Sequence, residues 1–161
     1  MKLTDASFNF AKAVARGALL TATKKDGAIN TMTVSWGGSG ILWGKEVCFV
    51  FVRPERYTFE FCQDGEIMSL SFFEDEKKDV LAFCGTKSGR DVDKFERCGL
   101  KYTLNDGACV FHDAKATVIM KKLYAQDLDK DCFVSDIAEP FYQNGGYHKM
   151  YVCEIKDIIV A

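Results

Sequence analysis

Three stretches of this sequence gather residues that could bind a flat, anionic ligand, and the first is 30-NTMTVSWGG-38. If it is a strand, alternation gives a hydroxyl face formed by Thr31, Thr33 and Ser35. The opposite face would carry Asn30, Met32, Val34 and Trp36. Hydroxyls suit the polar rim of a planar heteroaromatic ring, and a thioether or an indole suits its plane. Threonine is also common in strands, so an ordinary exposed strand face explains the same pattern.

The second stretch, 53-RPERYTFEF-61, places two arginines where a strand would pass into a helix. Arg53 and Arg56 are followed there by the hydroxyls of Tyr57 and Thr58. Guanidinium forks, hydroxyls and the free N–H groups of a helix N-terminus together make a phosphate site. The alternative is a pair of surface arginines neutralised by nearby glutamates.

The third stretch, 83-FCGTKSGRDVDKFERCG-99, is a pliant loop that runs into a short helix. Its candidate ligand-binding residues are Ser88, Gly89, Arg90, Asp91 and Lys94. Asp91 would cap the helix, and Lys94 would lie in its first turn, where a cation opposes the helix dipole unless an anion is close. The alternative is an Asp-capped helix with solvated charges.

The composition limits the classes of function open to the chain. Its 161 residues are 48% hydrophobic and 27% charged, which fits one packed domain over residues 1–161. A net charge of −2 argues against a nucleic-acid binder. The N-terminal residues lack a secretory h-region, and no apolar run reaches the ~20 residues of a membrane-spanning helix. We therefore expect a cytoplasmic protein with no membrane or nucleic-acid partner.

The seven cysteines form no CxxC pair, and the chain has only two histidines. A zinc, iron–sulfur or dithiol redox motif is therefore poorly supported, and we expect no metal site. Reduced thiols that pack as small hydrophobic side chains are the expected state.

Hydrophobic periodicity predicts a mainly β chain with short helices inserted between the strands. Helices are expected over 4–15 (with Thr4 or Asp5 as N-cap), 55–63, 76–84, 91–98 and 129–138. A hairpin around Asp26-Gly27 is expected over 18–36, then a glycine-rich loop at 37–40. Further strands are expected over 46–53, 66–73, 109–124 (one or two strands) and 147–160. Strand 46–53 is apolar on both faces, so one face would line a barrel interior and the other a helix or a partner subunit.

Hairpin-connected strands favour a closed or split antiparallel β-barrel, which hides the edges of the sheet. No GxGxxG follows the first strand, which disfavours a Rossmann dinucleotide site. There is also no GxSxG nucleophile elbow of a hydrolase. Two phosphate-type segments and one flat-ligand segment in a small β domain suggest a single nucleotide-like ligand, and flavin mononucleotide (FMN) has the required planar ring, polyol and phosphate.

In their order along the chain, NTMTVSWGG, VRPERYTFEF, MSLSFF, FCGTKSGRDVDKF and YHKMYVCEI resemble the flavin reductase-like family, and within it the flavoredoxin-type branch. The resemblance covers the chain from about Phe8 to Ile158. It implies an FMN-binding split β-barrel with Greek-key-like connections. It also implies a homodimer, with the flavin near the subunit interface.

The resemblance also implies roles for residues. The isoalloxazine ring would be bordered by Asn30, Met32, Thr33, Val34, Ser35 and Trp36. The ribityl phosphate would be held by Arg53, Arg56, Tyr57 and Thr58, and enclosed by Ser88, Gly89, Arg90, Asp91 and Lys94. His148 would lie on the nicotinamide side of the flavin as the catalytic residue, although a histidine bonded to a neighbour on a strand face is the alternative. Cys153 stands where the family strand usually has glycine, and its side chain would narrow the space for nicotinamide.

Two functions follow from the resemblance. The first is an NAD(P)H:flavin oxidoreductase, in which NADH or NADPH is the co-substrate and no acid or base is needed for the hydride step. The second is a flavoredoxin-like FMN electron carrier that exchanges electrons with a redox protein. A flavin-free barrel would be the third reading, and a pyridoxamine-phosphate oxidase-like activity is disfavoured by the order of the motifs.

Overall fold

The computed structural model describes residues 9–161 and begins with a short helix. This helix, α1 (Phe10–Arg16), starts after Asn9, whose side chain accepts a hydrogen bond from the Lys12 N–H at 2.9 Å. The helix expected over 4–15 is therefore present in its second half. Its expected N-caps, Thr4 and Asp5, lie outside the described residues.

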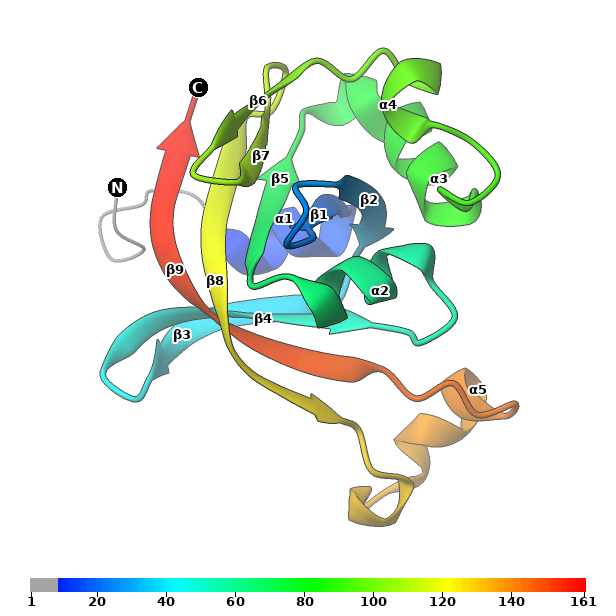
Figure 1. Ribbon diagram of the computed structural model, residues 1–161. Helices are drawn as coiled ribbons and strands as arrows, with labels where there is room; N and C mark the ends of the chain where they lie inside the picture. Colours follow the sequence, from blue (N-terminus) through cyan, green and yellow to red (C-terminus); the bar gives the residue numbers. More distant parts are fainter. Residues whose placement is uncertain (1–8) are drawn as a thin grey trace.

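Seven antiparallel strands form the main sheet, in the order β2-β1-β5-β8-β9-β4-β3. Their bounds are β1 (Ala18–Thr23), β2 (Ile29–Val34), β3 (Gly37–Leu42), β4 (Lys45–Val52), β5 (Ile67–Phe72), β8 (Ala116–Asp127) and β9 (Lys149–Val160). The long strands β8 and β9 curve across the molecule, so the sheet wraps around one core (Figure 1). Strands β1, β4, β5, β8 and β9 all contribute alternate side chains to that core, and α1 and α2 (Tyr57–Asp64) cover its openings.

The first hairpin forms as the sequence predicts. Asp26 and Gly27 make the turn between β1 and β2, with Gly27 at a φ of +88° and the Lys24 N–H bonded to the Ala28 carbonyl at 2.8 Å. Six residues of each strand then pair, from Ala18 opposite Val34 to Thr23 opposite Ile29. Strand β4 also agrees with the prediction, since both of its faces carry buried side chains, such as Val47 on one face and Val50 on the other.

The glycine-rich stretch 37–40 is a strand, so the loop expected there is wrong. Gly37 begins β3 and pairs with Val50 of β4. A Cβ atom at Gly37 would lie 2.6 Å from the Phe49 carbonyl oxygen, so glycine is required by the close approach of two strands. The composition of the segment alone suggests flexibility, because the contact that fixes it is distant in sequence.

A second layer covers the outer face of β1. It contains α3 (Lys78–Thr86), α4 (Lys94–Arg97) and a hairpin of β6 (Tyr102–Asn105) and β7 (Ala108–Phe111), preceded by the 3-10 turn η2 (Asp75–Lys77). The stretch 109–124 thus divides into β7 and β8. Asp93 caps α4 by accepting hydrogen bonds from the N–H groups of Phe95 and Glu96. The expected cap Asp91 is therefore wrong, and the helix starts later and is shorter.

The segment between β8 and β9 projects from the barrel (Figure 1). It holds two 3-10 turns, η3 (Lys130–Cys132) and η4 (Asp136–Ala138), and the short helix α5 (Glu139–Tyr142). The α-helix expected over 129–138 is replaced by these tighter turns. Its polar residues find local partners instead, as when the Asp129 carboxylate accepts from the Asp131 N–H.

All seven cysteines are free, and five of them are buried. Burial raises the pKa of Cys48, Cys62, Cys84 and Cys109 to about 12, so these thiols stay protonated. Residues 9–161 contain no cluster of side chains suited to a metal ion. No helix within the same residues is long and apolar enough to span a membrane.

Candidate functional site

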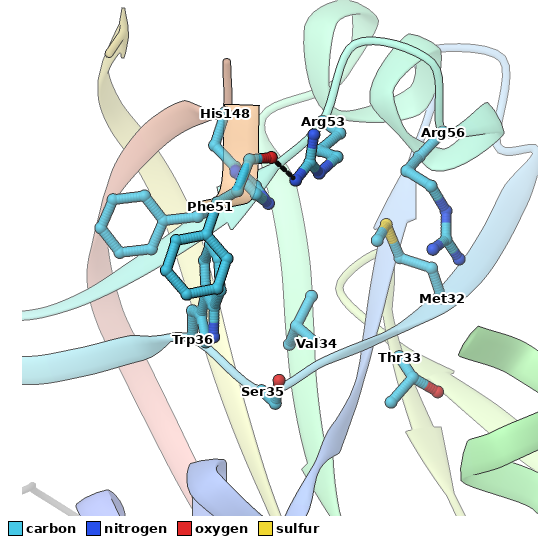
Figure 2. Close-up of a pocket in the computed structure, with 10 residues that line it drawn as sticks. Met32, Thr33, Val34, Ser35, Trp36, Phe51, Arg53, Arg56 and His148 are labelled. Carbon is cyan, nitrogen blue, oxygen red and sulfur yellow. Dashed lines mark hydrogen bonds between the residues drawn. The ribbon is translucent and has the colours of Figure 1, made fainter. Parts of the chain in front are cut away.

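A cavity of about 280 Å³ opens where the ends of β2 and β4 meet (Figure 2). It is lined by Met32, Thr33, Val34, Ser35, Trp36, Phe51, Arg53, Arg56, Phe141 and His148. The sequence motifs predicted all of these except Phe51 and Phe141. Phe51 was assigned only to a strand face, and Phe141 lies in a segment without a recognisable motif.

One wall of the cavity is aromatic. The ring of Trp36 lies 5.0 Å from that of Phe141, edge to face, and 4.9 Å from the imidazole of His148. Figure 2 shows Trp36, Phe51 and His148 on one side of the cavity, with Met32 and Arg56 across from them. Trp36 is 41% exposed and Phe141 is 47% exposed, so an apolar surface faces solvent at the mouth. Such a wall suits a flat ring.

The hydroxyl face of β2 points away from this wall. The Thr31 hydroxyl accepts from the Thr21 hydroxyl at 3.0 Å and donates to the Leu20 carbonyl. The Thr33 hydroxyl donates to the Leu81 carbonyl at 2.6 Å, which attaches α3 to β2. These hydroxyls stabilise the fold, and because Thr31 is fully buried the exposed strand face given as the alternative is wrong for it. Thr33 borders the cavity with its other atoms.

The two arginines of the second motif reach the cavity but also bond to backbone carbonyls. Arg53 donates to the carbonyls of Phe141 at 2.8 Å and Gly146 at 3.3 Å. Arg56 donates to the carbonyls of Gly85 at 2.9 Å and Cys84 at 3.3 Å. A guanidinium has five N–H donors, so each arginine keeps donors for a ligand.

Burial lowers the pKa of Arg56, and the carboxylate of Glu55 acts in the opposite direction. A guanidinium remains charged despite such a shift. Arg56 is therefore a partly buried cation at the end of the cavity across from the aromatic wall (Figure 2).

A second hollow of about 450 Å³ lies further along β2, and most of the candidate residues in the third stretch, 83–99, line it. Of the predicted site residues, it is lined by Asn30, Tyr57, Gly89, Arg90, Asp91 and Lys94. Asn30 is two residues from Met32 on the same strand face, and Tyr57 follows Arg56. Both hollows are thus bordered by the same two segments.

The walls of this second hollow are fixed by short contacts. The Asn30 side-chain amide donates to the buried hydroxyl of Thr58 at 2.8 Å. A Cβ atom at Gly89 would lie 2.2 Å from Asn30 Oδ1 and 3.0 Å from the Tyr57 ring. The Ser88 hydroxyl accepts from the Arg90 N–H at 3.2 Å. Only glycine at position 89 therefore allows this loop to lie against β2.

The cations of the third motif have different surroundings. Arg90 lies over the Tyr57 ring at 4.7 Å and forms an ion pair with Glu60 at the surface. Lys94 is buried, and its ammonium donates to the carbonyls of Thr31 at 2.8 Å and Cys84 at 3.0 Å. Burial lowers the pKa of Lys94 to about 8. Lys94 thus bridges β2 and α3, a role that its position in the sequence did not indicate.

His148 meets both descriptions given by the sequence, since it borders the cavity and is bonded to a neighbour. Its Nδ1 lies 2.7 Å from the Tyr142 hydroxyl. Burial lowers the pKa of His148 to about 4, with a further contribution from the charge of Arg53 and a smaller opposing one from Glu55. The imidazole is therefore neutral near pH 7.

Cys153 does not narrow the cavity, contrary to the expectation. It is fully buried in the barrel core and faces Cys48 across the β4–β9 ladder. Alternation along β9 places Tyr151, Cys153 and Ile155 together inside the barrel. The side chain therefore points away from the space beside Trp36 and His148.

Comparison with known proteins gives one family and a consistent fold. Residues 11–161 match the family described as "Flavin reductase like domain". No curated protein matches the sequence.

Three solved structures illustrate the fold. A flavoredoxin from Methanosarcina acetivorans aligns with a TM-score of 0.71 at 18% identity, over 90% of this chain and 68% of its own. A protein from Shewanella frigidimarina, assigned as a flavin reductase with a split barrel domain, aligns with a TM-score of 0.71 at 18% identity, over 90% and 66%. The NADH:FAD oxidoreductase SgcE6 from Streptomyces globisporus, in complex with NAD and FAD fragments, aligns with a TM-score of 0.66 at 14% identity, over 90% and 74%. These likenesses confirm the predicted split barrel.

Proposed function

Because this chain belongs to the flavin reductase-like family, we propose that its cavity binds FMN and that the protein is an NAD(P)H:flavin oxidoreductase. The observation that carries the proposal is the cavity itself, which has an aromatic wall at one end and the Arg56 cation at the other. The second hollow lies further along β2 and is lined by Arg90.

The edge of β2 suits the polar rim of a flavin ring. β2 is the terminal strand of the sheet, so one side of its backbone has no strand partner within the described residues. Backbone groups of an edge strand point outward at every second residue. The Thr31 carbonyl already points outward to Lys94, and the same alternation directs the N–H and C=O of Thr33 outward. A planar ring along Met32–Trp36 would meet one donor and one acceptor there.

The phosphate of the ligand would extend toward Arg56 and the second hollow. Guanidinium groups bind phosphate with paired N–H donors, and glycine permits close approach of the chain. In this proposal the phosphate end is formed by Arg53, Arg56, Tyr57, Thr58, Ser88, Gly89, Arg90, Asp91 and Lys94. Thr58 and Lys94 would act by positioning Asn30 and β2, since the Thr58 hydroxyl accepts from Asn30 and the Lys94 ammonium donates to the carbonyls of Thr31 and Cys84. FAD, the flavin named for SgcE6, is the other ligand to be tested.

The chemistry itself would belong to the flavin, which accepts a hydride from NAD(P)H and leaves NAD(P)⁺. The protein would bind the two rings, orient them and exclude water. Trp36, Phe51 and Phe141 supply the apolar surface, and neutral His148 supplies a polar group beside it. No general acid or base is needed for the hydride step.

An electron carrier is the second candidate, and one observation favours it. Trp36 and Phe141 leave apolar surface at the mouth of the cavity, where a protein partner would cover it. A carrier would hold FMN, like a reductase, but would be reduced by a redox protein in place of NAD(P)H.

We also propose that the protein is a cytoplasmic homodimer. Ile41 and Trp43 at the tip of the β3–β4 hairpin are exposed, and Tyr124 on β8 lies against Trp43. A second copy is a suitable cover for this apolar surface. Analytical ultracentrifugation of the protein and of Trp43→Glu, which is expected to weaken self-association, tests the proposal.

The test of function is anaerobic. The protein is titrated with FMN and, separately, with FAD, free flavin is removed, and NADH or NADPH is added while the visible flavin band is recorded. Bleaching supports the reductase, and a bound flavin that stays oxidised supports the carrier. Failure to bind either flavin would overturn both. His148→Ala is expected to keep the affinity for FMN and to slow bleaching, and an unchanged rate would remove His148 from the catalytic role.

A further inference from the structure

His148 is enclosed by groups from three parts of the chain. Trp36 follows β2, Arg53 and Glu55 follow β4, and Tyr142 ends α5. Of the two imidazole nitrogens, Nδ1 is taken by the Tyr142 hydroxyl at 2.7 Å. Nε2 is therefore the nitrogen left for a ligand in the cavity that His148 lines.

The direction of the Tyr142–His148 hydrogen bond follows from the surroundings of the phenol. Burial raises the pKa of Tyr142, so the hydroxyl keeps its proton. That proton needs an acceptor, and among the described residues Nδ1 of His148 is the partner within hydrogen-bond distance of the hydroxyl, at 2.7 Å.

The reverse arrangement would be costly. If Nδ1 carried the proton and donated to the phenol oxygen, the phenol O–H would need another acceptor. Tyr142 is only 8% exposed, and a buried donor without a partner is destabilising.

We infer that Tyr142 is a positioning residue that fixes His148 as the neutral tautomer protonated on Nε2, so that the imidazole presents a hydrogen-bond donor to the cavity. Arg53 supports this state, because its guanidinium lies 5.1 Å from the centre of the Tyr142 ring and disfavours a second positive charge nearby. Tyr147 stacks on Tyr142 at 4.5 Å and holds the phenol in place.

A fixed donor selects the ligand group that it meets. The cavity is thereby matched to a molecule with an acceptor, such as a carbonyl oxygen, beside the aromatic wall, and mismatched to one that presents an N–H there. This consequence rests on the proposed function, because it concerns the molecule that exchanges electrons with the flavin. The tautomer itself does not rest on it.

The tautomer can be measured without flavin. Long-range ¹H–¹⁵N NMR of the ring nitrogens distinguishes the two neutral forms, and the chain has only two histidines, so His112 serves as an internal reference. We expect His148 to be protonated on Nε2 between pH 6 and 8, and Tyr142→Phe to lose this preference while His112 is unchanged. Tyr102→Phe, an exposed tyrosine on β6, is the control. Protonation on Nδ1 in the unaltered protein, or no change in Tyr142→Phe, would overturn the inference.

A second measurement separates positioning from simple packing. Glutamine at position 148 carries an N–H donor at the distance of Nε2 and has no tautomers. Tyr142→Phe is expected to slow flavin reduction about 10-fold when His148 is present, the loss of one donor, and to have no effect in a His148→Gln background. Equal slowing in both backgrounds would mean that Tyr142 only packs. If the NMR result holds and no flavin is reduced, the proposed function fails and the tautomer assignment stands.

Discussion

Arg53 Nη2 donates a hydrogen bond to the Phe141 carbonyl oxygen at 2.8 Å and so ties the end of β4 to the segment between β8 and β9. The second Arg53 bond, to Gly146, closes the same connection from the other end of the loop. The aromatic wall thus depends on a contact between parts of the chain that are 88 residues apart. Arg53 acts first as an anchor of the cavity wall.

Arg53→Ala is expected to free this loop. Hydrogen exchange of the amides from 141 to 147 should become faster, because two charge-assisted bonds to the backbone are lost. The affinity for FMN should fall about 10-fold, since Phe141 would no longer be held against Trp36. Arg97→Ala removes an exposed arginine from α4 and serves as the control. Unchanged exchange in the 141–147 loop would show that other contacts hold it.

Arg56→Ala tests the cation at the opposite end of the cavity. A partly buried guanidinium that binds a phosphate is worth about 1.5–3 kcal/mol, so the dissociation constant for FMN should rise about 10- to 100-fold. Fluorescence titration measures this change. Arg56→Lys keeps the charge but loses the paired N–H donors. Its dissociation constant for FMN should lie between those of the unaltered protein and Arg56→Ala. If Arg56→Ala bound FMN as tightly as the unaltered protein, Arg56 would not belong to the site.

Gly89→Ala tests the close approach of the third motif to β2. The added methyl group would meet Asn30 Oδ1 at 2.2 Å, and Asn30 is held in place by its bond to buried Thr58. We expect a loss of about 1–3 kcal/mol in the free energy of unfolding and a weaker affinity for FMN. Gly40→Ala is the matched control, because a Cβ atom there meets nothing within 4 Å. Equal stability of both variants would contradict the packing described at position 89.

Lys94 should make stability depend on pH in the alkaline range. Burial lowers its pKa from 10.5 to about 8, so between these values the unfolded chain binds more protons than the folded one. Its contribution to stability therefore rises from pH 8 to pH 10.5, by at most about 3 kcal/mol. Buried thiols with raised pKa act in the opposite direction, so the measurement is a difference between the protein and Lys94→Met.

Urea unfolding of both proteins under reducing conditions at pH 7.5 and pH 10 gives this difference. The thiols are common to both and cancel. The unaltered protein should gain stability relative to Lys94→Met at the higher pH. A difference that stays constant would show that Lys94 is not charged and buried as its two carbonyl partners indicate.

The sequence predicted those parts of the fold that depend on local pattern. Alternation and the Asp26-Gly27 turn gave the first hairpin, and the double apolar pattern of residues 47–52 gave a strand buried on both faces. The prediction was wrong where a contact with another residue determines the local structure. Gly37 is in a strand because of Phe49, and α4 starts late because Asp93 accepts two N–H groups.

The candidate site was likewise predictable in part. Motifs located the lining residues from Met32 to Trp36, but nothing in the sequence indicated that the Thr31 and Thr33 hydroxyls bond inside the protein. Phe141 was missed because its place at the cavity depends on Arg53, far away in sequence. The sequence did not indicate the bonds of Lys94 to two carbonyls, because only the packing of α3 on β2 brings these carbonyls together.

The cavity lies where no sheet hydrogen bond joins β2 to β4 within residues 9–161. Its width is therefore set by side chains at strand ends, chiefly Trp36 and Phe51, and by the anchored loop that carries Phe141. Substitutions at these positions would enlarge or reduce the aperture without breaking a ladder. In such a barrel the size of the ring that the cavity accepts can change while the core remains the same. The choice of the second reactant can change with it.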